Sequence, residues 1–253
     1  NKGDVNWNLG ANFSINRNKV LSLVGGADIP GVTLKNPLSV PVNVVREGYP
    51  LGVFLGFVED GLTPEGNIKY VDQDANGTIN NLDRVIIGNP NPKFTFGLNS
   101  TVTYRNFDLS FLINGVQGND IFNFNLANLA DGFAFGLNQV SDVLGNYWTP
   151  ENPNTYAKYP RISKATQYRA SDRFVEDGSY IRMRNVQLGY TFAGNGVLNK
   201  SQVYLAAQNL FTITNYSFYS PEVNTQGVDM SRGIDMYGYP DAKTFMLGVR
   251  LKL

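Results

Sequence analysis

The stretch Phe94–Asn114 reads FTFGLNSTVTYRNFDLSFLIN and decides the fold. Up to Tyr104, apolar side chains alternate with Thr, Gly and Asn, as in a strand whose two faces meet different environments. The alternation breaks at Arg105-Asn106 and resumes at Phe107, which predicts an antiparallel hairpin with a very short turn. The polar face is almost uncharged, which is typical of a β-barrel with lipid on its apolar side and a wet lumen on the other.

The composition excludes several classes of function. The 21 Lys and Arg residues balance 21 Asp and Glu residues, which argues against a nucleic-acid partner held through phosphate groups. The absence of Cys and His removes thiolate metal sites, Ser-His-Asp and Cys-His catalysis and most zinc sites. Carboxylate pairs such as Glu59/Asp60 and Asp229/Asp235 are present, but nothing marks either pair as a general acid and base, so we expect no enzyme.

Further strands follow from the same alternation. We predict them over Asp4–Asn16, Ser179–Phe192, Ser201–Leu210 and from Phe245 to Leu253, without a facing for the weakly alternating Ser201–Leu210. Arg182 and Arg184 fall on the apolar face of their strand. Because a charge costs about 2–4 kcal/mol at the bilayer midplane but little near an interface, we expect both arginines above the lipid.

The connections between these six strands are long, short, long, short and long, which places all long links at one end of an antiparallel sheet. The predicted fold is therefore all-β: an arc of about six antiparallel strands of a large transmembrane β-barrel with long extracellular loops. The expected extracellular loops are Asn16–Pro92, Gly115–Gly178 and Phe211–Ala242. An aromatic girdle is expected at the short-turn end, from Tyr104, Phe107, Tyr190, Phe192 and Tyr204.

Two features lie within the long loops. Within Leu137–Trp148, apolar residues recur at helical spacing, which predicts a short helix before Thr149-Pro150. Loop tyrosines such as Tyr216, Tyr219 and Tyr237 could stack on sugar rings or pack locally, so no substrate-binding residues are assigned from sequence.

The segment Asp72–Asp83, DQDANGTINNLD, has the spacing of an EF-hand-type calcium loop. Oxygen-bearing side chains occupy positions one, three, five, nine and twelve, Gly77 occupies position six, and position seven would offer a backbone carbonyl. Position twelve is Asp rather than the longer Glu, and no convincing helix flanks the loop. The alternative is a turn rich in its own side-chain hydrogen bonds. The predicted Ca²⁺ ligands are Asp72, Asp74, Asn76, Thr78, Asn80 and Asp83.

Six stretches in order resemble the C-terminal barrel segment of SusC/RagA-type TonB-dependent outer-membrane transporters. They are Asn12–Val20, Tyr70–Asn123, Tyr147–Arg161, Asp177–Phe192, Tyr204–Asn224 and Tyr239–Leu253. The resemblance departs at Leu253, where many barrels end in an aromatic residue. It implies that residues 1–253 are the C-terminal part of one barrel, with the plug and the N-terminal strands outside this chain.

The resemblance also implies a location in the outer membrane of a Bacteroidetes-like Gram-negative bacterium, in contact with its lipid. It further implies import of a glycan or peptide driven through TonB, and a SusD-like surface lipoprotein as a lid over the loops. A rival interpretation is a soluble, secreted calcium-binding β-sandwich that binds glycans through exposed aromatic residues. The rival requires charges on the polar strand faces, where the sequence mostly has Thr, Asn, Ser and Gly.

Overall fold

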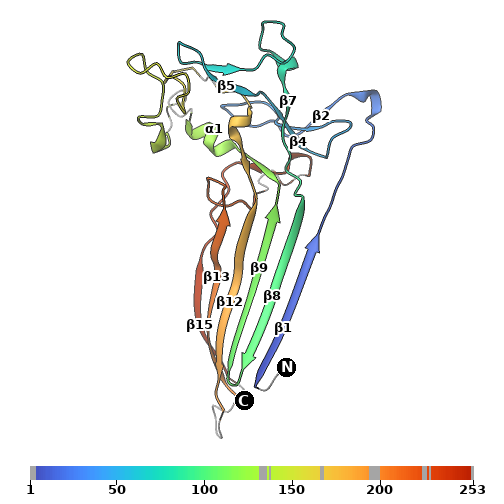
Figure 1. Cartoon of the computed structure of the whole chain (residues 1–253), viewed down its shortest axis with the longest axis vertical. Helices are drawn as coiled ribbons and strands as arrows, with labels where there is room; N and C mark the ends of the chain where they lie inside the picture. Colours follow the sequence, from blue (N-terminus) through green and yellow to red (C-terminus); the bar gives the residue numbers. More distant parts are fainter. Residues whose placement is uncertain are drawn as a thin grey trace.

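The computed structural model describes residues 4–130, 136, 138–165, 168–193, 200–223, 227 and 229–251. A six-stranded antiparallel sheet forms a long curved wall (Figure 1). Its strands, in spatial order, are β1 (Val5–Ser14), β8 (Phe94–Tyr104), β9 (Phe107–Gln117), β12 (Tyr180–Thr191), β13 (Gln202–Thr214) and β15 (Thr244–Arg250). The six predicted strands are confirmed, although the predicted end of the last one at Leu253 lies outside the described residues.

The registers place the apolar side chains of all six strands on one face of the wall. Trp7 stands opposite Val102 on the neighbouring strand, and Leu188 stands opposite both Leu109 and Leu205. This face is uncovered, because Trp7 is 62% exposed and Leu247 is 78% exposed. A sandwich would pack a second sheet onto that face, and among the described residues none lies there, so the sandwich interpretation is wrong.

The register also assigns the facing of β13, which the sequence left open. Leu205 lies opposite Leu247 and belongs to the apolar face, whereas Tyr204 lies opposite Gly189 and Gly248 on the polar face. Tyr204 therefore does not belong to the aromatic girdle, contrary to the prediction.

The other girdle residues do gather at the short-turn end. Tyr104 pairs with Phe107 next to the β8–β9 turn. The ring of Phe107 lies 4.9 Å from that of Tyr190, which lies 5.3 Å from that of Phe192.

A β-bulge in β12 overturns the predicted facing of two arginines. The pairing shifts between Met183 and Asn185 in both ladders of this strand. One extra residue reverses the in–out alternation beyond it. Arg182 consequently lies opposite Asn114 and Thr212 on the polar face, and Arg184 donates a hydrogen bond to Asn114 on the same side.

The three long connections gather at one end of the wall, opposite the two short turns, and form a compact head (Figure 1). The head holds three small sheets. They are β2 (Ile29–Pro30), β3 (Asn43–Val45), β4 (Val53–Gly56) and β7 (Val85–Gly88); β11 (Val175–Asp177), β10 (Asp120–Asn123) and β14 (Ile234–Asp235); and β5 (Glu59–Leu62) with β6 (Ile68–Tyr70). The buried core lies in this head, around Phe54, Phe122, Phe124 and Phe174, which are fully buried.

Helical structure is sparse in the described part of the chain. One α-helix is found among the described residues; α1 spans Phe124–Ala130 and was not predicted. The 3-10 helices span Val24–Gly26, Asn81–Asp83, Ser141–Val143, Asp172–Phe174 and Asp229–Ser231. Among the described residues, no helix is long and apolar enough to cross a membrane.

The helix predicted within Leu137–Trp148 is wrong. Only the single 3-10 turn Ser141–Val143 forms there, and Leu137 lies outside the described residues. The helical path ends at Val143, because Leu144 is extended with a ψ of 119°, and Gly145 then adopts a positive φ of 80°. Tyr147 instead bridges to Tyr159, so the apolar residues reach the core from an irregular segment.

Candidate functional site in the head and at its junction with the wall

The predicted calcium loop connects two strands, β6 and β7, rather than two helices. Carboxylate oxygens of Asp72, Asp74 and Asp83 lie within 4.8 Å of one another. Gly77 adopts a φ of 83°, the sharp turn that position six requires. The fold therefore brings together three of the six predicted ligands as carboxylates around one point.

The other three predicted ligands are engaged within the loop. The side-chain oxygen of Asn76 accepts the backbone N–H of Thr78 at 2.8 Å, and the carbonyl of Thr78 accepts the amide of Asn80 at 3.0 Å. Asn80 also caps the 3-10 helix Asn81–Asp83 by accepting the N–H of Leu82 at 2.8 Å. These bonds agree with the alternative interpretation, a turn stabilised by its own side-chain hydrogen bonds. The three close carboxylates agree with the calcium interpretation, because a hard cation prefers oxygen ligands.

Asp83 is the buried member of this loop. Its two carboxylate oxygens accept the backbone N–H groups of Asn80 at 2.7 Å and of Gln73 at 2.8 Å. The N–H of Asn80, and then that of Gln73, lowers the pKa of Asp83 below its usual range against the effect of burial. Asp83 is therefore ionised at neutral pH beside two further carboxylates.

A charged cluster fastens the last loop to the polar face of the wall. We call it the arginine cluster; its members are Arg182, Arg184, Thr212, Ser220, Glu222 and Asp241. The guanidinium of Arg182, only 2% exposed, donates to Glu222 at 2.7 Å and to Asp241 at 2.5 Å. Burial raises the pKa of Asp241, but hydrogen bonds from Ser220 and Arg182 outweigh it and hold that pKa below its usual range.

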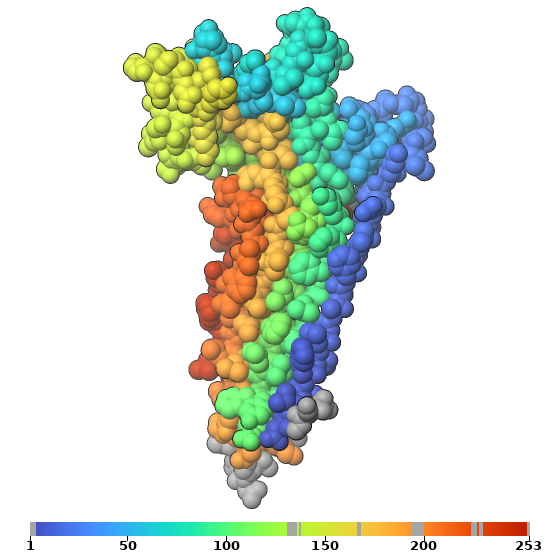
Figure 2. Space-filling model, viewed as in Figure 1, coloured from blue at the N-terminus to red at the C-terminus, as the bar shows by residue number. Residues whose placement is uncertain are grey.

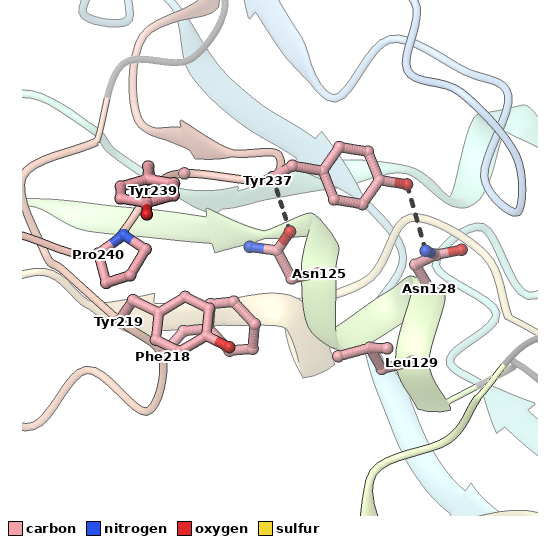
Figure 3. Close-up of a pocket in the computed structure, with 9 residues that line it drawn as sticks. Asn125, Asn128, Leu129, Phe218, Tyr219, Tyr237, Tyr239 and Pro240 are labelled. Carbon is pink, nitrogen blue, oxygen red and sulfur yellow. Dashed lines mark hydrogen bonds between the residues drawn. The ribbon is translucent and has the colours of Figure 1, made fainter.

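The three tyrosines considered from sequence behave differently from one another. Tyr216 is buried and donates to Asp235 at 2.6 Å, so it packs locally. Burial, and then the bond to Asp235, raises the pKa of the Tyr216 hydroxyl, which therefore remains a donor. Tyr219 and Tyr237 are 65% and 56% exposed and line the same pocket (Figure 3).

This aromatic pocket has a volume of about 480 Å³. Its lining comes from α1, from the segment after β13 and from the segment after β14 (Figure 3). The lining residues are Asn125, Asn128, Leu129, Phe218, Tyr219, Tyr237, Gly238, Tyr239 and Pro240. Sequence reasoning missed most of them, and the concentration of Tyr, Phe and Pro between residues 216 and 240 was the only local signal.

Three of the four carboxylates considered for catalysis, Glu59, Asp60 and Asp235, have side-chain partners in the head, and the side chain of Asp229 lies outside the described part of the structure. Glu59 accepts from Ser171 at 2.7 Å and pairs with Arg173. Asp60 forms an ion pair with Lys69, and Asp235 receives the Tyr216 hydroxyl. The carboxylates described here are thus tied to structural partners.

Comparison with known sequences identifies relatives over almost the whole chain. The chain is 33% identical over 279 residues to the TonB-dependent receptor P3 of Formosa agariphila, and 30% identical over 265 residues to the TonB-dependent receptor SusC of Bacteroides thetaiotaomicron. Both alignments cover 98% of this chain but only 27% and 24% of those proteins. The chain therefore spans about a quarter of the length of these relatives. No protein-family model matches it.

Solved structures agree on the fold. A chain in a structure of the RagAB peptide transporter matches with a TM-score of 0.79 at 22% identity, over 99% of this chain and 27% of that chain. A structure of the RagAB peptide importer in an open-open state matches with a TM-score of 0.77, over 100% of this chain and 27% of that chain.

A single-layer wall with one apolar and one weakly charged face, crowned by long loops, defines a segment of a β-barrel. The relatives identify which family of β-barrel proteins this segment resembles. The predicted resemblance to SusC/RagA-type TonB-dependent receptors is confirmed, and this chain is a homologue of part of such a receptor. The relatives carry the names of receptors and of a transporter, which agrees with the expectation of a protein that is not an enzyme.

Proposed function

We propose that this chain forms part of the barrel of an outer-membrane TonB-dependent importer that takes up glycans or peptides. The observation that carries the proposal is the wall itself. Its apolar face is uncovered over six strands, while its other face carries mainly Asn, Thr, Ser, Gln and Gly. This is the two-sided pattern of a barrel between lipid and a wet lumen.

The head defines the mouth of the proposed importer. Three long connections, tied together by a buried aromatic core, would stand on the extracellular side, where a SusD-like lipoprotein would sit as a lid. The space-filling view shows the head standing wider than the wall beneath it (Figure 2). In this proposal the plug, the remaining strands and the segment that contacts TonB belong to the rest of the receptor.

The test is purification of the native protein from outer membranes in mild detergent, with mass spectrometry of every co-eluting protein. A long receptor chain containing this sequence, together with a stoichiometric surface lipoprotein, is the expected result. Recovery of this chain as a soluble species without a partner would refute the proposal.

We also propose that the Asp72–Asp83 loop binds Ca²⁺ as a structural ion. Support comes from the three carboxylates within 4.8 Å and from the ionised, buried Asp83. The ion would offset the repulsion between these groups with an affinity of about 10⁻⁴–10⁻³ M, as in extracellular modules. Proteolysis of the loop should accelerate with chelator, and Asp72→Ala combined with Asp74→Ala should remove that dependence. Equal cleavage of the parent protein with and without chelator would refute the site.

A further inference from the structure

The aromatic pocket combines exposed rings with one unsatisfied hydrogen-bond donor. Asn125 is 2% exposed, and its side-chain nitrogen has no hydrogen-bond partner among the described residues. An unsatisfied buried donor is unfavourable and rare, so it calls for an explanation, such as a role in binding a ligand.

The orientation of the Asn125 amide is fixed by its neighbour. Its oxygen accepts the backbone N–H of Tyr237 at 2.7 Å, so its nitrogen must point the other way. Figure 3 shows that nitrogen directed toward the space between Tyr239, Pro240 and Tyr219. The donor therefore faces the pocket that the aromatic residues line.

The turn that carries these rings is held in a strained conformation. Tyr237 has a φ of 63°, in the left-handed region that non-glycine residues rarely occupy. The backbone N–H of Tyr237 donates to the side-chain oxygen of Asn125, and the Tyr237 hydroxyl accepts a hydrogen bond from Asn128 at 3.2 Å. The ring of Phe124 packs edge-on against the Tyr237 ring, with 5.9 Å between the ring centres. Such strain persists where the surroundings over-determine it, and it clusters at ligand sites.

The lining is aromatic and uncharged. Tyr239 and Tyr219 are 91% and 65% exposed, and none of the described residues that line the pocket carries a charge. The nearby Asp235 is occupied by Tyr216 and by the N–H of Gly238 at 3.0 Å. A charged ligand would find no counter-ion in this lining. A pocket of about 480 Å³ with apolar faces and a few fixed polar groups suits a small neutral ligand.

From these observations we infer that the aromatic pocket binds a sugar ring of a neutral oligosaccharide. The C–H face of the ring stacks on Tyr239, which at 91% is more exposed than Tyr219, and a ring hydroxyl or ether oxygen accepts the hydrogen bond from Asn125. A peptide would need strand pairing or a counter-charge for a terminus, and the lining offers neither. The inference rests on the proposed importer function and names the substrate class for one site in its mouth.

The test measures binding by calorimetry on the full receptor purified from outer membranes in detergent. The probes are maltohexaose, cellohexaose and mannohexaose as neutral oligosaccharides, and tetra-alanine as a peptide. At least one oligosaccharide should bind. Tyr239→Ala should weaken that binding about tenfold, the upper range for one aromatic contact, and Tyr239→Phe should retain it. Tyr156→Ala is the matched control, because Tyr156 is a head tyrosine that is 89% exposed and lies outside the pocket lining.

Three outcomes would overturn the inference. In the first, the receptor binds none of the three oligosaccharides. In the second, the Tyr239→Ala and Tyr156→Ala receptors bind the oligosaccharide with equal affinity, and in the third, only tetra-alanine binds and its binding depends on Tyr239. If the first outcome is found and Tyr239→Ala also lowers the melting temperature, the rest of the receptor fills the pocket. The importer proposal fails separately, when the protein does not purify as a membrane receptor with its lipoprotein.

Discussion

Replacing Arg182 with methionine should release the last loop from the polar face of the wall. The Arg182 side chain is 2% exposed and donates to Thr212 at 2.8 Å, Ser220 at 3.0 Å, Glu222 and Asp241. Methionine has a similar length and no charge, so it keeps much of the packing and removes all of these bonds. Glu222 retains Arg184 as a partner, whereas Asp241 loses its bond to the guanidinium and keeps only the hydroxyl of Ser220 from this cluster.

The expected loss follows from the exposure of the partners. Breaking a buried ion pair by removing one member costs about 3–5 kcal/mol. Glu222 and Asp241 are 22% and 39% exposed, and water therefore recovers part of their solvation. We expect about 3 kcal/mol, the lower end of that range, which corresponds to an increase on the order of 100-fold in the population of the detached loop.

Hydrogen exchange on the full receptor in detergent measures this population through the amides of residues 215–223 and 234–243. The control is Lys69→Met, which removes an exposed ion pair with Asp60 and should cost less than about 1 kcal/mol. Exchange in these segments that is as slow in Arg182→Met as in Lys69→Met would refute the cluster as the fastening of the loop.

Three further predictions concern the wall and the calcium loop. Val186 lies on the apolar face opposite Phe111 and Ala207, further from the girdle than Leu188. Val186→Arg should destabilise the lipid-embedded receptor by about 2–4 kcal/mol and Gln187→Arg by far less, as measured by unfolding in vesicles; equal effects would contradict the facing of β12. Gly248→Val should destabilise the wall by about 1–3 kcal/mol, because a Cβ atom added at position 248 would lie 2.4 Å from the ring of Tyr204. Thermal unfolding measures this loss, and adding Tyr204→Ala to Gly248→Val should suppress it. Folding lowers the pKa of Asp83. The ionised Asp83 therefore stabilises the folded loop above the ordinary carboxyl pKa, and this contribution is lost as the pH falls through the lower pKa that Asp83 has in the folded state. Acid should speed proteolysis of residues 72–83, and Asp83→Asn should abolish that pH dependence.

The site was only partly accessible from sequence. Asp72, Asp74 and Asp83 lie within one loop, so their spacing was sufficient to predict that their carboxylates converge. The aromatic pocket was not predictable, because the Tyr237 and Asn125 that hold it together are 112 residues apart. The helix α1 was missed as well; its seven residues include two Asn, which favour caps and turns over helix interiors.

The sequence by itself determined the six strands and the end of the sheet at which the long loops gather. This was possible because lipid and lumen impose their demands on alternate residues, and a period of two is visible within a single strand. Only the tertiary structure decided the facing of Arg182, because one bulged residue reverses the alternation without any signal in the composition. Only the tertiary structure built the arginine cluster and the aromatic pocket, because both depend on loops that meet after the wall has aligned their ends.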